Sequence, residues 1–76
     1  MARGKAGISL NTRFGKRLRS LRKEKRWTFV YLSEASGVAV GFLHALEQGT
    51  KEPCLNTIDV LAKSFGMSIS EFTDGV

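Results

Sequence analysis

Residues 28–53, TFVYLSEASGVAVGFLHALEQGTKEP, decide the fold. Thr28 can cap a helix, because its hydroxyl can accept a hydrogen bond from a free amide of the first turn. Gly37 and Gly49 can each adopt the left-handed conformation that ends a helix. The apolar residues between these two glycines recur at helical spacing, at Val38, Phe42, Leu43 and Leu46. Two short helices joined by a tight glycine turn are typical of the helix-turn-helix motif.

A further helix is predicted before this stretch. Phe14, Leu18 and Leu21 step by four and three residues, which places them on one inward-facing stripe. We expect this helix to be capped by Asn11 or Thr12 and to end near residue 26. Gly15 lies inside it at a cost of about 1 kcal/mol against alanine, and close packing against a neighbouring element would explain it.

Two more helices are predicted after the stretch. Pro53 introduces a fourth helix, Cys54 is its expected N-cap, and Gly66 ends it. The apolar stripe of this helix consists of Leu55, Ile58, Leu61, Ala62 and Phe65. Residues 68–71, Ser-Ile-Ser-Glu, fit a capping box and begin a short last helix. Since no strand pattern appears, the sequence predicts an all-α domain.

The charge is strongly asymmetric along the chain. The net charge is +5, yet ten of the twelve Lys and Arg lie in residues 1–26 with one acid, so this third carries +9. The remaining residues hold two basic and six acidic side chains, a net −4. Such asymmetry indicates a polyanionic partner. A solvated helix surface with a loose tail explains the charge equally well, and the helix-turn-helix pattern favours nucleic acid.

The composition of the chain gives no indication of secretion, membrane insertion, metal binding or catalysis. One cysteine cannot form an internal disulfide, and no apolar run has the length of a membrane span or of a signal sequence. We therefore expect a cytoplasmic protein that does not act at a membrane. His44 and Cys54 are too few for a metal site, and nothing indicates a cofactor or a small-molecule ligand. No nucleophile–base set, phosphate loop or carboxylate pair indicates an enzyme.

The first residues differ in character from the rest. Residues 1–11 are predicted to form a flexible basic arm, and residues 12–76 to form the helix-turn-helix domain. Arg3 and Lys5 could reach along a DNA groove, as basic arms do. The competing interpretation is a tail that binds nothing specifically.

Five pieces of the chain resemble the Cro-like, phage-repressor-like helix-turn-helix family, also called the xenobiotic-response-element family. They are FGKRLRSLR at 14–22, LSEASGV at 32–38, FLHALEQG at 42–49, PCLNTI at 53–58 and LAKSFGMSISEF at 61–72. The resemblance implies a compact five-helix domain of the phage-repressor type, with helices 2 and 3 reading DNA. It also implies a structural ion pair between Arg22 and Glu47, in which the guanidinium fork suits a carboxylate.

The resemblance further implies a DNA-contacting set. Its members here are Thr28, Phe29, Ala39, Val40, Gly41, His44, Ala45, Thr50 and Lys51. Phe29 stands where a polar phosphate contact is usual in the family. The base-reading positions Val40, Gly41 and Ala45 cannot form bidentate hydrogen bonds, although Val40 and Ala45 could touch thymine methyl groups. DNA shape, phosphate contacts or the arm would then supply specificity. His44 could contact DNA or act as a solvent-facing spacer.

Two functions remain open from the sequence. The first is a sequence-specific regulator that binds double-stranded DNA as a homodimer, with helix 3 in the major groove. The second is a protein-interaction module of the same fold, such as an antitoxin-like or adaptor subunit. The lack of polar side chains at the base-reading positions of helix 3 and the apolar residues 29–31 favour the protein-interaction module. The basic N-terminal third favours the DNA-binding regulator. The homodimer is expected to pair through helices 4 and 5, at Val60, Met67, Ile69 and Phe72. For Cys54 a redox switch competes with a plain small residue.

Overall fold

Five helices form the part of the chain that the structure, a computed structural model, describes: residues 9–76. They are α1 (Leu10–Lys25), α2 (Phe29–Ser36), α3 (Val40–Gln48), α4 (Leu55–Ser64) and α5 (Ile69–Phe72). The predicted all-α, five-helix fold is therefore confirmed. Arg3, Lys5 and most of the predicted arm lie outside the described residues.

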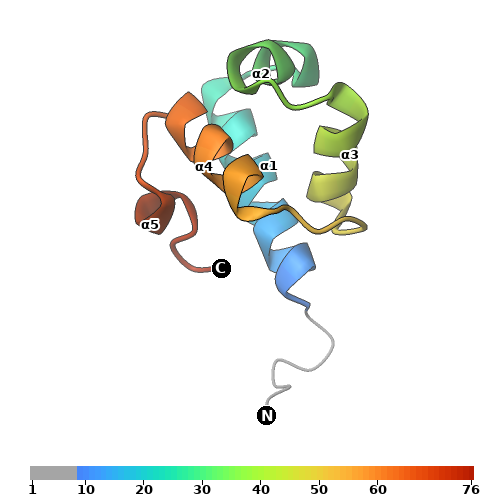
Figure 1. Ribbon diagram of the computed structural model, residues 1–76, viewed down its shortest axis with the longest axis vertical. Coiled ribbons are helices and arrows are strands. Elements are labelled where there is room, and N and C mark those ends of the chain that lie inside the picture. The colour runs from blue at the N-terminus through green and yellow to red at the C-terminus, as the bar shows by residue number, and fades with distance from the viewer. Residues whose placement is uncertain (1–8) are drawn as a thin grey trace.

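The helices surround one apolar core. In Figure 1, α4 lies in front of α1, α2 crosses the upper end, α3 runs along one side and α5 lies on the other. Each helix buries one stripe and leaves the opposite face in water, as amphipathic helices do. The buried apolar residues are Phe14, Leu18, Leu21, Leu32, Leu43, Leu46, Leu61, Ala62, Phe65 and Phe72. Each fully buried leucine contributes about 1.5–3 kcal/mol relative to an exposed one.

The helix ends follow local capping chemistry. The Thr28 hydroxyl accepts a hydrogen bond from the Tyr31 amide at 3.0 Å, as predicted. Gly37 (φ 80°) and Gly49 (φ 76°) end α2 and α3 in the left-handed region. The capping box that begins α5 is also present. These contacts join residues five or fewer apart in the chain, which is why the sequence alone could predict them.

The beginning of α1 corrects one prediction. Its N-cap is Ser9, not Asn11 or Thr12, and the Ser9 hydroxyl accepts a hydrogen bond from the Thr12 amide at 3.1 Å. The helix therefore begins at Leu10, earlier than predicted. Serine caps as well as asparagine does, so residue type could not decide between the candidates.

Two burial predictions also need correction. Leu55, predicted in the inward stripe of α4, is 78% exposed, because that stripe starts a turn later. Phe72, predicted at a dimer interface, is fully buried and packs edge-on against Phe14 with ring centres 5.6 Å apart. A side chain enclosed in the monomer's own core has no surface to offer a second copy.

Gly15 lies where α1 and α3 approach each other closely. A Cβ atom at this position would lie 2.7 Å from the Glu47 carbonyl oxygen and would also meet the Leu46 carbonyl. The obstacle is backbone, which cannot move aside without separating the helices. The expected close packing is therefore confirmed, and it explains a glycine inside a helix.

Two arginines of α1 hold the C-terminal turn. The Arg17 Nε donates to the Phe72 carbonyl at 2.9 Å, and its Nη2 donates to the Glu71 carbonyl at 2.8 Å. The Arg13 Nε donates to the Val76 carbonyl at 3.3 Å. Cations are favourable at the C-terminal end of a helix, where free carbonyls gather. Part of the basic N-terminal third therefore serves the fold and is not open for a partner.

Candidate nucleic-acid interface

The helix pair α2–α3 has the geometry of a helix-turn-helix. The chain bends by 111° between the two helices, and residues 37–39 form the connection. Leu43 and Leu46 anchor α3 in the core, whereas Gly41, His44 and Gln48 are exposed on its opposite side. In DNA-binding domains of this kind, the second helix of the pair enters the major groove.

The candidate contact residues are distributed around this exposed side. Thr28, Ala39, Gly41, His44, Thr50 and Lys51 are exposed, and Phe29, Val40 and Ala45 are partly buried. The Thr50 hydroxyl donates a hydrogen bond to the Ala45 carbonyl at 3.2 Å, so it helps to cap α3. Within α3 itself, this side therefore presents small residues, Gly41 and Ala45, beside His44.

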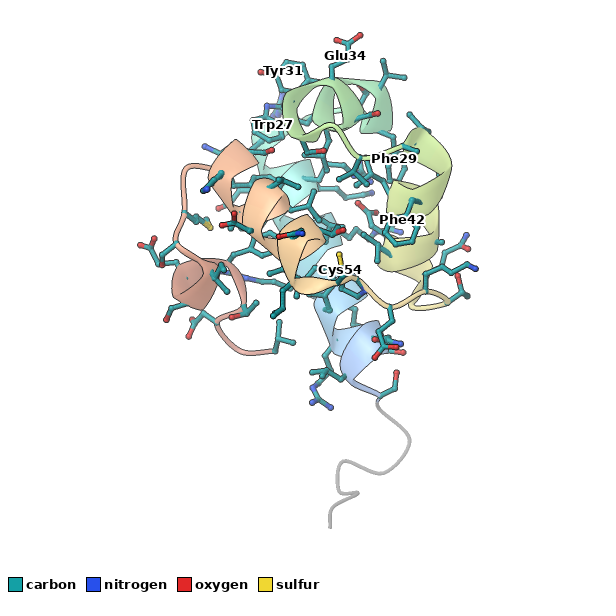
Figure 2. The ribbon with its side chains drawn as sticks, in the orientation of Figure 1. Trp27, Phe29, Tyr31, Glu34, Phe42 and Cys54 are labelled. Atoms are coloured by element: carbon teal, nitrogen blue, oxygen red, sulfur yellow. The ribbon has the colours of Figure 1, made fainter. Side chains whose placement is uncertain are left out.

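Phe29 has a structural role that the sequence did not reveal. Its ring stacks on the His44 ring with centres 3.9 Å apart, and the Arg22 guanidinium carbon lies 4.0 Å from its centre. Arginine is attracted to the negative face of an aromatic ring. Figure 2 shows Phe29 between α2 and α3, where it links both helices to α1. The stacking holds the His44 ring at the edge of the exposed side of α3. No local spacing signals a pair that lies fifteen positions apart.

Arg22 connects α1 to the end of α3. Its Nε lies 2.6 Å from Glu47 Oε2 and its Nη2 lies 3.1 Å from Oε1, and its Nη1 donates to the Trp27 carbonyl at 2.9 Å. Only 11% of the Arg22 side chain and 4% of the Glu47 side chain are exposed. The hydrogen bond to Glu47 raises the pKa of Arg22. This bidentate tie sets the position of α3 against α1.

The apolar start of α2 divides into two parts. Phe29 packs inward, whereas Val30 is 59% and Tyr31 50% exposed. Tyr31 contacts Trp27, which stacks on Phe65 of the core with ring centres 4.8 Å apart. Figure 2 shows Tyr31 and Glu34 projecting outward from α2. Val30 and Tyr31 are therefore the exposed apolar residues of this helix.

Cys54 is exposed at the N-cap of α4, as predicted. Its sulfur lies 3.3 Å from the Thr57 hydroxyl, and this hydrogen bond lowers the pKa of the thiol. Within residues 9–76, no three His, Cys, Asp or Glu side chains are grouped so that they could hold a metal ion. In the same residues no single helix has the length and apolar character to cross a membrane, and only the bent pair α2–α3 passes that test jointly.

The fold and the exposed side of α3 define a helix-turn-helix domain. The profile of the Cro/C1-type helix-turn-helix DNA-binding domain matches residues 17–74. The chain therefore belongs to the Cro/C1-type helix-turn-helix family, which is the resemblance that its sequence motifs indicated.

Two proteins that are similar in sequence are consistent with this family membership. The chain is 33% identical over 60 residues to the HTH-type transcriptional regulator DdrOP3 of Deinococcus deserti, covering 79% of this chain and 46% of that protein. It is 30% identical over 56 residues to the immunity repressor protein of Bacillus phage phi105, covering 74% of this chain and 39% of that protein. It thus spans less than half the length of these two relatives.

Solved structures share the fold. The restriction-modification controller protein C.AhdI of Aeromonas hydrophila superimposes with a TM-score of 0.78 at 29% identity, covering 82% of this chain and 94% of that one. The clp gene regulator ClgR of Corynebacterium glutamicum superimposes with a TM-score of 0.81 at 33% identity, covering 91% and 90%. Because each solved chain is covered almost completely, the five-helix arrangement is shared as a whole.

Proposed function

We propose that this protein is a transcriptional regulator that binds double-stranded DNA with α3 in the major groove. One observation carries the proposal: α3 is held firmly on its inner side while Gly41, His44 and Gln48 face solvent. A rigid support with an open outer face is what base contact requires, because readout depends on fixed geometry. The regulators and the phage repressor among its relatives support the same conclusion.

The shape of α3 suggests how it reads DNA. Gly41 and Ala45 let the helix backbone approach the base edges closely, and Val40 and Ala45 can touch thymine methyl groups. Direct hydrogen bonding to bases then falls to His44 and Gln48. Contacts to phosphates, from residues such as Lys51, hold the helix in register without reading sequence.

A protein-interaction module is the second candidate. Exposed Val30 and Tyr31 favour it, since neighbouring apolar side chains on one surface can mark a binding site. This alternative predicts that the wild type binds no DNA. It also predicts that the Val30→Asp variant loses binding to the protein partner.

Duplex binding should depend steeply on salt. If a dimer neutralises about six to ten phosphates, log affinity should fall against log salt concentration with a slope of about −5 to −9. Fluorescence anisotropy with a labelled duplex across a range of KCl concentrations measures this slope. Absence of binding at low salt, or a flat dependence, would refute a DNA-binding function.

The Gly41→Gln variant tests where α3 lies in that complex. Gly41 is exposed, and no neighbouring group lies within 4 Å of a Cβ built there, so the position accepts the longer side chain. Glutamine can pair with adenine in the major groove, so sequences selected from random duplexes should shift towards adenine at one position per half-site. Unchanged selection would mean that α3 does not face the bases.

We also propose a homodimer that pairs through α4 and α5. Phe72 is excluded by burial, and Ile69 is 43% exposed while Val60 and Met67 are partly buried. Ile69→Asp should shift sedimentation at micromolar concentration from twice the 8.4 kDa chain mass towards the monomer, because a carboxylate resists burial between copies. An aspartate in the first turn of a helix is otherwise favourable, so the fold should persist.

Val30→Asp is the matched control. Val30 is 59% exposed and also lies in the first turn of a helix, but on α2. This variant should keep the dimer mass. Equal dissociation of both variants, or a monomeric wild type, would contradict pairing through α4 and α5.

A further inference from the structure

A row of exposed cations lies along α1, outside the helix-turn-helix itself. Lys16, Arg19 and Lys23 are spaced by three and four residues, so they lie on one side of the helix within about two turns. All three are exposed, and none has a carboxylate within 4 Å among residues 9–76. We call these three residues the α1 basic row. It differs from Arg13, Arg17 and Arg22, whose guanidinium groups bind other parts of the protein.

The α1 basic row borders the candidate DNA-reading helix. Gly15 contacts the backbone of α3, and Arg22 reaches Glu47 of α3. Arg19 lies about 40° around the helix from Gly15 and about 60° from Arg22, since each residue advances by 100°. The core-facing residues Phe14 and Leu18 lie on the other side of that contact. The row therefore lies on the side of α1 opposite its buried stripe of Phe14, Leu18 and Leu21.

From this position we propose that the α1 basic row is a second DNA contact, which binds phosphates of the duplex beside the segment that α3 reads. The inference rests on the proposed DNA-binding function and extends it to a further surface. Cations about 5 Å apart along the helix axis can follow a phosphate backbone, whose charges repeat every 3.4 Å per strand. Since Lys16, Arg19 and Lys23 have no carboxylate partner among residues 9–76, each can replace a condensed counterion.

The surroundings of the row favour DNA over other anionic surfaces. The row contains no apolar side chain that could enter a lipid layer, and Ser20 is the exposed residue beside it. The row lies beside the contact between α1 and α3, on the opposite side of α3 from Gly41, His44 and Gln48, so the duplex must bend around α3 towards α1 to reach it. The bending energy would be offset by the added phosphate contacts.

The test compares two double variants that lose the same charge. Arg19→Gln with Lys23→Gln removes two members of the row, and Lys25→Gln with Lys63→Gln removes two exposed cations elsewhere. Lys25 lies about 160° around α1 from Lys23, and Lys63 is on α4. Glutamine is a good helix former, so circular dichroism and thermal melting should match the wild type in both variants.

Binding is measured by anisotropy with a labelled mixed-sequence duplex of about thirty base pairs across KCl concentrations, long enough to extend beyond one half-site. Loss of two phosphate contacts per chain should reduce the salt slope by about 1.8 for each chain bound, and the control should reduce it by less than half as much. Equal slopes in the two variants, with binding by the wild type intact, would overturn the α1 contact and leave the proposed function standing. No duplex binding by the wild type would overturn both.

A poly-L-glutamate probe under the same conditions covers the remaining alternative. If the wild type binds poly-L-glutamate only weakly, and the Arg19→Gln, Lys23→Gln variant binds it equally weakly, the row is assigned to DNA. Binding as strong as that of the duplex, with the same loss in the Arg19→Gln, Lys23→Gln variant, would assign the row to an acidic protein instead.

Discussion

Replacing Arg22 with alanine is expected to lower the free energy of unfolding by about 3–5 kcal/mol, because it leaves Glu47 buried without its partner. Glu47 has only 4% of its side chain exposed, so water cannot replace the two hydrogen bonds it receives from Arg22. The substitution also removes the hydrogen bond to the Trp27 carbonyl and the contact with the Phe29 ring. For a domain that is itself only marginally stable, this loss is a large part of the total.

Arg19→Ala is the matched control on the same helix. Arg19 is exposed and has no partner among the described residues, so its removal should change stability by less than about 0.5 kcal/mol. Urea denaturation followed by circular dichroism compares the two variants. Equal midpoints would show that the tie between α1 and α3 contributes nothing to stability.

Replacing Gly15 with alanine should have the second-largest effect. The added methyl group would press against the Leu46 and Glu47 carbonyls, so α1 and α3 must separate. Overpacking of this kind costs typically about 1–3 kcal/mol, and occasionally more when backbone is the obstacle. Alanine's better helix propensity returns about 1 kcal/mol of that cost. We expect a net loss of stability in thermal unfolding and an altered approach of α3.

Gly41→Ala provides the comparison, since it is the same chemical change in α3. No atom lies within 4 Å of a Cβ at that position, so only the gain in helix propensity applies. A gain of about 1 kcal/mol corresponds to a rise in Tm of about 4–8 °C for a domain of this size. If both variants moved Tm in the same direction, the close approach at Gly15 would not limit the packing.

The two substitutions act on the same feature, the placement of α3 on α1. Gly15 sets how closely α1 approaches Leu46 and Glu47, and Arg22, two turns further along α1, ties the Glu47 side chain. Both lie on the inner side of α3, opposite the residues that face solvent. Variants that loosen this support should therefore reduce sequence discrimination as well as stability, because base readout needs a fixed helix.

Local chemistry determined much of this protein from the sequence alone. The cap at Thr28, the left-handed glycines at residues 37 and 49 and the capping box at residues 68–71 act within a few residues, so the pattern of the chain predicts them. The order of apolar stripes then predicts five helices and a helix-turn-helix pair. The resemblance to a family added the Arg22–Glu47 pair, whose side chains the structure brings together.

Burial and long-range contacts were decided only by the tertiary structure. An apolar side chain at helical spacing can face the core or the water, and only the packing of the other helices determines that Phe72 is enclosed while Leu55 is exposed. The same holds for charge. A count of cations cannot separate Arg17, which holds the carbonyls of the C-terminal turn, from Arg19, which remains open to a partner. The sequence determined which helices form, since helix ends are local; the fold decided which side chains remain available, since availability depends on atoms that are distant in the chain.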